Sequence, residues 1–231
     1  MLVYAISDLH LPGGNSKPMN VFGSQWDDHF ERIRADWTSR VTDDDLVLLP
    51  GDLSWAMKLE DAREDIQSVA SLPGRKVIIR GTHDYWWASI SRVRDALPEG
   101  MYALQNDAVR VSGITLCGTR GWILPCDTSD AEDERICRRE LMRLEMSLER
   151  AKALSKGGII LCMLHYPPLT EANSDTEVTA LLEKYHVAHA VYGHLHGSAL
   201  KGAFRGEHNG VNYHQVSCDG TGFKLSLITQ A

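Results

Sequence analysis

Side chains that bind metal ions follow short apolar runs at five places along this sequence of 231 residues. In chain order they are Asp8, His10, Asp52, His83, Asp84, His165, His194 and His196. Carboxylates and imidazoles hold borderline divalent metals such as manganese, iron and zinc without thiolate ligands. The residue types therefore indicate a metal site built from distant parts of the chain.

A carboxylate shared between two metal ions has a definite chemical use. It can keep the ions roughly 3.5 to 4 Å apart, the separation at which both clamp one phosphoryl group during in-line displacement. Gly51, Gly81 and Gly193 lie next to the candidate ligands, where a residue without a Cβ lets the backbone turn sharply and approach the ions. The pattern predicts a two-metal site for phosphoester hydrolysis.

The five apolar runs are typical of buried strands, because they are short and are closed by glycine, proline or polar turn residues. They cover residues 2–6, 46–49, 77–79, 159–164 and 188–192. In an open α/β sheet, ligands bind in the crevice outside the carboxyl ends of the strands. We therefore expect the polar side chains to converge there, although they are far apart in sequence.

Each feature alone has an ordinary explanation. A lone histidine at a strand end, such as His10 or His165, is more often a surface residue than a ligand. Asp52 is by itself a common turn residue. His194 and His196 form a stronger signal, because alternate residues of an extended segment face the same way. The metal site is favoured because all five features occur together, each at a predicted strand end.

Together these motifs resemble the signature of the calcineurin-like metallophosphoesterases over residues 1 to about 200. The motifs are Asp8-Leu9-His10, Gly51-Asp52, Gly81-Thr82-His83-Asp84, His165 and Gly193-His194-Leu195-His196. Residues 17–23 and 84–87 further resemble a little-studied bacterial branch of this superfamily. The resemblance implies a four-layer α/β/β/α sandwich with two mixed β-sheets.

The resemblance also assigns the ligands of two divalent ions, with manganese, iron and zinc as the expected metals. It implies that Asp8, His10 and His196 hold the first ion, that His165 and His194 hold the second, and that Asp52 bridges them. The expected mechanism is attack on phosphorus by a hydroxide formed from water that the ions acidify.

Two catalytic roles are expected beside the metals. His83 would donate a proton to the leaving oxygen, and Asp84 would orient the His83 ring or tune its basicity. The alternative for Asp84 is that it caps a helix over residues 85–96. The two roles are compatible.

Thr82 departs from the family pattern, which has an asparagine ligand of the second metal at this position. A threonine is shorter, and its neutral hydroxyl is a poorer oxygen donor than an amide carbonyl. We expect weaker binding of the second ion and impaired catalysis. A native threonine is one explanation, but an introduced change is favoured because every other expected ligand position is filled.

Two segments are expected to shape the substrate pocket. The loop over residues 11–25 carries Lys17 and begins at the crevice. Arg120 follows another apolar run and suits bidentate phosphate contact, although a surface ion pair is the alternative. Trp86 and Trp87 could wall the pocket, although packing into the core is their commoner use.

The remaining periodicity predicts helices over residues 26–40, 59–72, 86–97 and 131–154. Short strands over 101–104, 108–111 and 114–117 are expected to open a second sheet, and 211–217 and 222–228 add further strands. We interpret the helix over 131–154 as a solvated helix that lies on a sheet. Its Arg138, Arg139 and Arg143 would reach an anionic substrate only if the helix overhangs the crevice.

Composition predicts a single domain over residues 1–231, because a hydrophobic content of 43% can fill a large core and no linker divides the chain.

Five cysteines form no CxxC pair, and no leader or membrane-spanning run appears, so a reducing cytoplasmic setting without a membrane partner is expected. The net charge of −7 makes nucleic acid an unlikely partner.

Three functions fit these features. The favoured function is a phosphatase or phosphodiesterase that acts on a small phosphorylated substrate. A nuclease is the second enzymatic alternative, although it would need a long basic groove. The third is a binding scaffold with a decayed metal site, and only Thr82 supports this alternative. The sequence leaves the natural substrate and the oligomeric state open.

Overall fold

The computed structural model describes residues 1–14, 18–124 and 130–230. Its strands form a sheet of five strands in the order β11-β1-β2-β3-β4 and a sheet of six in the order β5-β6-β7-β8-β10-β9. In the first sheet, β1 to β4 are parallel neighbours and β11 pairs with β1 in the antiparallel sense. These strands are β1 (Leu2–Ala5), β2 (Leu46–Leu49), β3 (Arg75–Ile78), β4 (Met101–Ala103) and β11 (Ser226–Gln230).

The second sheet has a parallel centre with antiparallel edges. Strands β6, β7, β8 and β10 run parallel, while β5 and β9 pair antiparallel with the strands at its two ends. The strands are β5 (Ala108–Val111), β6 (Ile114–Thr119), β7 (Ile160–Leu164), β8 (His189–Tyr192), β9 (Gly206–His208) and β10 (Val211–Gln215). Both sheets are therefore mixed, as predicted.

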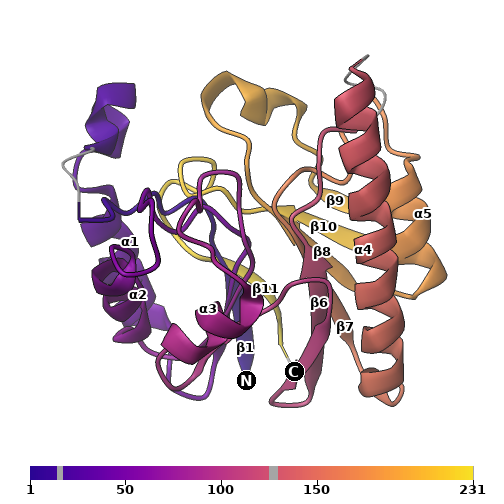
Figure 1. Ribbon diagram of the computed structural model, residues 1–231, viewed down its shortest axis with the longest axis horizontal. Helices are drawn as coiled ribbons and strands as arrows, with labels where there is room; N and C mark the ends of the chain where they lie inside the picture. Colours follow the sequence, from indigo (N-terminus) through magenta and orange to yellow (C-terminus); the bar gives the residue numbers. More distant parts are fainter. Residues whose placement is uncertain (15–17, 125–129, 231) are drawn as a thin grey trace.

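Helices cover the outer faces of the two sheets (Figure 1). On the first sheet they are α1 (His29–Arg40), α2 (Arg63–Ala70) and α3 (Ile90–Ala96), and on the second they are α4 (Ala131–Ser155) and α5 (Glu177–Lys184). Short 3-10 turns are η1 (Met19–Phe22), η2 (Ser24–Trp26) and η4 (Gly197–Gly202). The predicted α/β/β/α order of layers is confirmed.

Alternation along the strands builds three hydrophobic layers. Val3 and Leu161, from β1 and β7, lie in the buried cluster between the sheets. Tyr4, next to Val3, packs in the cluster under the first three helices. Cys162, next to Leu161, packs in the cluster under α4 and α5. Successive strand residues face opposite ways, so both sheets are buried on both faces and their carboxyl ends are held rigidly.

The structure corrects several predicted boundaries. Strand β4 belongs to the first sheet, because α3 carries the chain back to lie parallel to β3, which is the usual crossover connection. Helix α3 begins only at Ile90, after the N-cap Ser89. Trp86 and Trp87 precede it and are buried in the first core cluster, so they do not wall the pocket. Helix α5 and strand β9 were not predicted.

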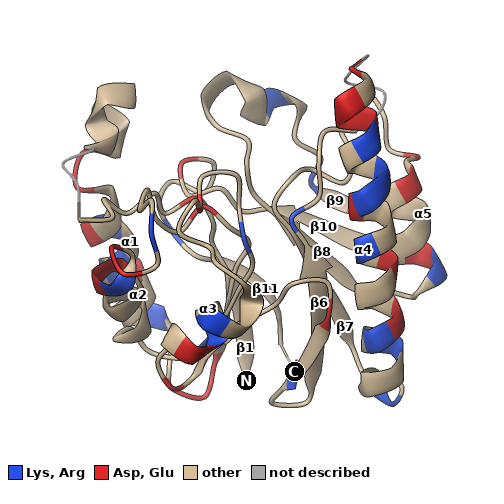
Figure 2. Ribbon diagram, viewed as in Figure 1, with Lys and Arg blue, Asp and Glu red and all other residues tan. Residues whose placement is uncertain are grey.

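Charged side chains of both signs alternate along α4 (Figure 2). Several form ion pairs within the helix, such as Arg135 with Glu132 at 2.6 Å. This agrees with its interpretation as a solvated helix on a sheet. Among the described residues, no helix has the length and apolar character needed to cross a membrane.

Candidate metal centre

Backbone hydrogen bonds join the loops that follow β1 and β2, and they bring the first candidate ligands together. The backbone N–H of Asp8 donates to the carbonyl of Gly51 at 3.0 Å, and that of His10 donates to Asp52 at 3.0 Å. Asp8, His10 and Asp52 all have a left-handed backbone, with φ of 60°, 46° and 53°. Such conformations are uncommon for residues other than glycine and cluster at functional sites.

Two groups of donor atoms result, each within 4.8 Å. One contains Asp8, His10 and His196, and the other contains Asp8, Asp52 and His165. Asp52 of the second group also approaches the first group, because its Oδ2 is 3.9 Å from His10 Nε2 and 3.5 Å from His165 Nε2. The structure thus brings these five predicted ligands together from both sheets.

The remaining two predicted ligands lie beside His165. Its Nδ1 donates to the carbonyl of Pro50 at 3.0 Å, which leaves the Nε2 lone pair facing the site. His194 Nδ1 lies 3.3 Å from that Nε2. Thr82 Oγ1 is 3.5 Å from His194 Nδ1, so the threonine occupies the edge of the second donor group.

Three glycines permit the close approach of the loops. A Cβ on Gly81 would collide with the Asp52 side chain, and one on Gly193 would collide with the Asp8 carboxylate. A Cβ on Gly51 would lie 2.7 Å from His165 Nδ1. The glycines are needed here because the backbone of one loop packs directly against the ligands of another.

The electrostatics of the site fit divalent cations. Burial, together with the charges of Asp8 and Asp84, raises the pKa of Asp52 to about 7 despite the opposing effect of His165. Burial lowers the pKa of His10 to about 3 and that of His194 to about 4. Crowded buried carboxylates beside neutral imidazoles are a donor set that a cation would stabilise. The residues therefore fit two borderline divalent metals.

Asp219 lies behind the candidate ligand His196, and the sequence did not single it out. His196 Nδ1 donates to Asp219 Oδ1 at 2.8 Å, and the Gly197 N–H donates to Asp219 Oδ2 at 3.0 Å. Burial lowers the pKa of His196, but the hydrogen bonds to Asp219 and Asp8 outweigh burial and raise the pKa to about 10. The carboxylate fixes the ring so that Nε2 faces Asp8 Oδ1 at 3.4 Å.

The Asp84 carboxylate joins the loops after β2 and β3. It accepts hydrogen bonds from the backbone N–H groups of residues 52, 53, 54 and 81 and from Trp86 Nε1, at 2.7 to 3.2 Å. The predicted helix-capping role is wrong, because α3 starts at Ile90, six positions after Asp84, and its N-cap residue is Ser89. Burial lowers the pKa of His83, and the charge of Asp84 opposes this shift.

An aromatic wall stands beside His83. Trp55 stacks on His10 with ring centroids 4.7 Å apart, and its centroid lies 4.5 Å from that of His83. Both histidines face a cavity of about 420 Å³ that is also lined by Met19 and Trp26. The stacking of Trp55 was not predicted, because it depends on how the β2 loop packs against the β1 loop.

The two predicted substrate-binding residues have different outcomes. Lys17 lies outside the described residues. Arg120 follows β6 directly, and its carbonyl accepts hydrogen bonds from the N–H groups of His165 and Tyr166 at 3.0 Å. Its guanidinium lies over the Trp122 ring, 4.5 Å from the centroid. Arg120 is therefore next to the metal centre, and the surface ion pair that was its alternative does not form among the described residues.

Comparison with known proteins gives one family and solved structures of similar fold. The family profile described as Calcineurin-like phosphoesterase matches residues 1–198. The protein of unknown function AQ665 from Aquifex aeolicus is 15% identical, with 98% of this chain and 95% of that chain covered at a TM-score of 0.51. Phosphopantetheinyl hydrolase (PptH) from Mycobacterium tuberculosis is 16% identical, with coverages of 94% and 88% and a TM-score of 0.57. At these identities the likeness concerns the fold alone. A search of curated proteins gave no match.

Proposed function

Because the chain belongs to the calcineurin-like phosphoesterase family, we propose that it hydrolyses phosphomonoesters or small phosphodiesters with two divalent ions. One observation carries this proposal. Two groups of carboxylate and imidazole donors share Asp8, and Asp52 of the second group also lies 3.9 Å from His10 of the first. This arrangement suits two ions that clamp one phosphoryl group.

The residues of the chain have separate tasks in this reaction. When bound, the ions would supply the Lewis acidity that polarises the phosphoryl oxygens and acidifies water. The Pro50 carbonyl and the Asp219 carboxylate hold His165 and His196 with Nε2 toward the site. His83 donates a proton to the leaving oxygen.

The cavity beside His83 supports a small organic ester as the substrate. Its volume of about 420 Å³ falls within the usual range for small-molecule sites. Trp55 and Met19 offer apolar contacts for the organic part, on the side where His83 meets the leaving oxygen. A nuclease would need a long basic groove, whereas α4 carries mixed charges and the chain has a net charge of −7. A cytoplasmic setting remains part of the proposal and is supported by the buried Cys117, Cys162 and Cys218, which form no disulfide among the described residues.

The test is metal content and turnover of the purified chain. A panel of phosphomonoesters and phosphodiesters is assayed with manganese, zinc, iron and magnesium. We expect metal-dependent hydrolysis of small esters that disappears on chelation and in His165→Ala. Bound metal without turnover of any ester, even after Thr82→Asn restores the family ligand, would instead support a binding scaffold. Turnover of nucleic acid alone would support the nuclease.

A further inference from the structure

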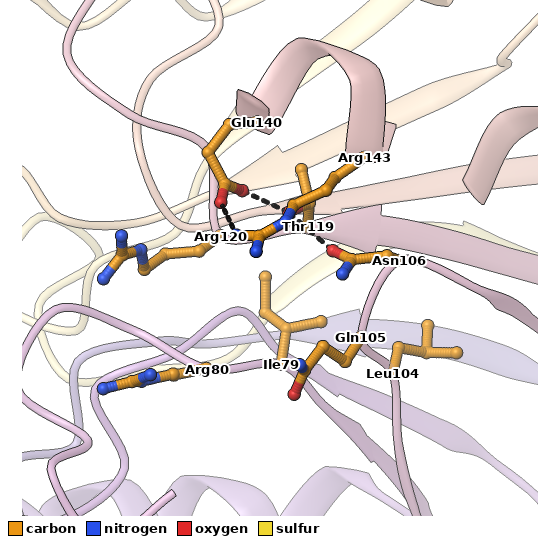
Figure 3. A pocket seen from close by; sticks show the side chains of 9 residues that line it. All are labelled: Ile79, Arg80, Leu104, Gln105, Asn106, Thr119, Arg120, Glu140 and Arg143. Carbon is orange, nitrogen blue, oxygen red and sulfur yellow. Dashed lines mark hydrogen bonds and ion pairs between the residues drawn. The ribbon is translucent and has the colours of Figure 1, made fainter. Parts of the chain in front are cut away.

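A second, polar cavity lies between the two sheets and α4 (Figure 3). Its volume is about 80 Å³, enough for a small polar group rather than a whole organic molecule. Arg80, Arg120 and Arg143 line it together with Glu140, Thr119 and Asn106. Three arginines face it, whereas Glu140 is the only acid among its lining residues.

Glu140 already has partners for both of its carboxylate oxygens. Glu140 is buried on α4 and pairs with Arg143 through a contact of 2.6 Å. Its other oxygen accepts the hydroxyl hydrogen of Thr119. The dashed contacts in Figure 3 show Glu140 joined to Arg143 and to Thr119. One positive charge of the cavity is therefore neutralised.

Arg80 and Arg120 have no such partner. Neither guanidinium forms an ion pair with an acid in residues 1–14, 18–124 or 130–230, and Arg80 Nε is buried without a hydrogen bond. Figure 3 shows both side chains extending toward the same side. Burial lowers the pKa of Arg120, with smaller contributions from the charges of Arg80 and Arg143, while Glu140 opposes them. Half-buried charges without a counter-ion are costly, so an anionic ligand would stabilise this pair.

The position of the pair relates it to the reaction. Arg80 directly precedes Gly81 and Thr82, and the backbone of Arg120 is hydrogen-bonded to that of His165. None of the predicted metal ligands lines this cavity. The arginines are therefore neighbours of the phosphoryl site but are not part of it.

We propose that Arg80 and Arg120 bind a second phosphate group of the substrate, which makes the natural substrate a small bisphosphate. This inference rests on the proposed function. A phosphate monoester carries about −1.5 to −2 charges at neutral pH, which matches two unpaired arginines. The planar guanidinium fork binds phosphate oxygens in a bidentate manner. The organic part would then span from the leaving oxygen beside His83 to this cavity, with Trp55 and Met19 beside its first atoms.

The kinetic test compares n-propyl phosphate with the bisphosphate of trimethylene glycol, which has the same carbon chain and one phosphate more. We expect the wild type to prefer the bisphosphate in kcat/KM. Arg80→Gln and Arg120→Gln should each lower that preference by about 10- to 100-fold, since each removes charged hydrogen bonds to the second phosphate. Arg80→Lys and Arg120→Lys keep the charge and should retain part of it. Equal losses on both substrates would overturn the proposal.

A binding test separates this inference from the proposed function. Inorganic phosphate is titrated calorimetrically into metal-free protein, which has no metal-borne phosphate site. We expect wild-type binding that is weakened at least about tenfold in Arg80→Gln and Arg120→Gln, and unchanged in the exposed control Arg110→Gln. If the wild type hydrolyses no ester but shows this pattern, the proposed function fails and the anion site stands. If the variants bind phosphate as the wild type does, the site is refuted.

Discussion

Replacing Asp219 with asparagine is expected to weaken the first metal site without disturbing the fold. The carboxylate accepts from His196 Nδ1 through Oδ1 and from the Gly197 N–H through Oδ2. An amide has the same shape, but only one of its two ends accepts hydrogen bonds. Either the histidine or the backbone N–H must therefore lose its partner in Asp219→Asn.

The size of the effect follows from the position of Asp219 behind a ligand. Loss of a carboxylate that orients a metal-binding histidine typically reduces metal affinity or activity 10- to 100-fold. That corresponds to about 1.4 to 2.8 kcal/mol of binding free energy. The loss should concern one of the two ions, because His196 belongs only to the donor group of Asp8 and His10.

The assay is a calorimetric titration of metal-free protein with manganese or zinc, with turnover measured at each metal concentration. The matched control is Asp175→Asn, which also removes the carboxylate of a histidine pair, with Asp175 Oδ1 3.0 Å from His208 Nε2, but at an exposed position. We expect Asp175→Asn to bind metal like the wild type. If Asp219→Asn binds both ions with wild-type affinity, the assignment of Asp219 as a positioning residue is refuted.

Four further changes have defined outcomes. Thr82→Asn should strengthen binding of the second ion and raise turnover, as judged by metal stoichiometry and kcat, because an amide oxygen is a better ligand than a hydroxyl. His83→Gln should slow alkyl phosphates by about 10² to 10⁴, but para-nitrophenyl phosphate far less, because a good leaving group needs no proton. Asp84→Ala should lower the free energy of unfolding by at least about 3 kcal/mol in urea denaturation, because five buried or partly buried donors lose their acceptor. His214→Gln should reduce the acid sensitivity of metal-free protein, measured as the change in unfolding free energy with pH.

The sign of the pH effect follows from the pKa of His214. Burial, assisted by the charge of His189, lowers the pKa of His214 to about 4 from an unfolded value of 6.5. The unfolded chain takes up the proton first, so stability present above pH 6.5 is lost as the pH falls toward 4. A variant with the acid sensitivity of the wild type would contradict this.

Controls keep the other predictions specific. Thr82→Val, which is similar in shape but lacks the hydroxyl, should not gain metal or activity. The exposed variants Asp61→Ala and His186→Asn should leave the unfolding free energy and its pH dependence close to those of the wild type. If Asp84→Ala is as stable as Asp61→Ala, the loops do not depend on that carboxylate.

The convergence of the candidate metal ligands could be predicted because each of them follows a strand with a clearly apolar sequence. Asp219 could not be identified in the same way, because β10 alternates apolar Val211 and Tyr213 with polar residues and its end was placed at Ser217. The signal was nevertheless present, since Cys218-Asp219 is another carboxylate just beyond a strand. Trp55 gave no signal of its own, because its contact with His10 arises only when two loops pack together.

The order of layers followed from strand and helix periodicity, whereas the assignment of strands to sheets did not. Residues 101–103 have the composition of a strand in either sheet, and only the α3 crossover places them beside β3. The start of α3 was misjudged because Trp86 and Trp87 fit a helical spacing. In the structure their indole N–H groups instead donate to Asp84 and Gln105, at 2.8 Å in each case. Such tertiary hydrogen bonds override local helical preference.

The division of the ligands between the two sheets has a consequence for biosynthesis. Asp8 and Asp52 leave the ribosome early, whereas His165, His194 and His196 are translated only in the last third of the chain. Neither donor group is complete before His165 and His196 have emerged. Neither candidate donor group can therefore hold an ion until the last third of the chain has been translated.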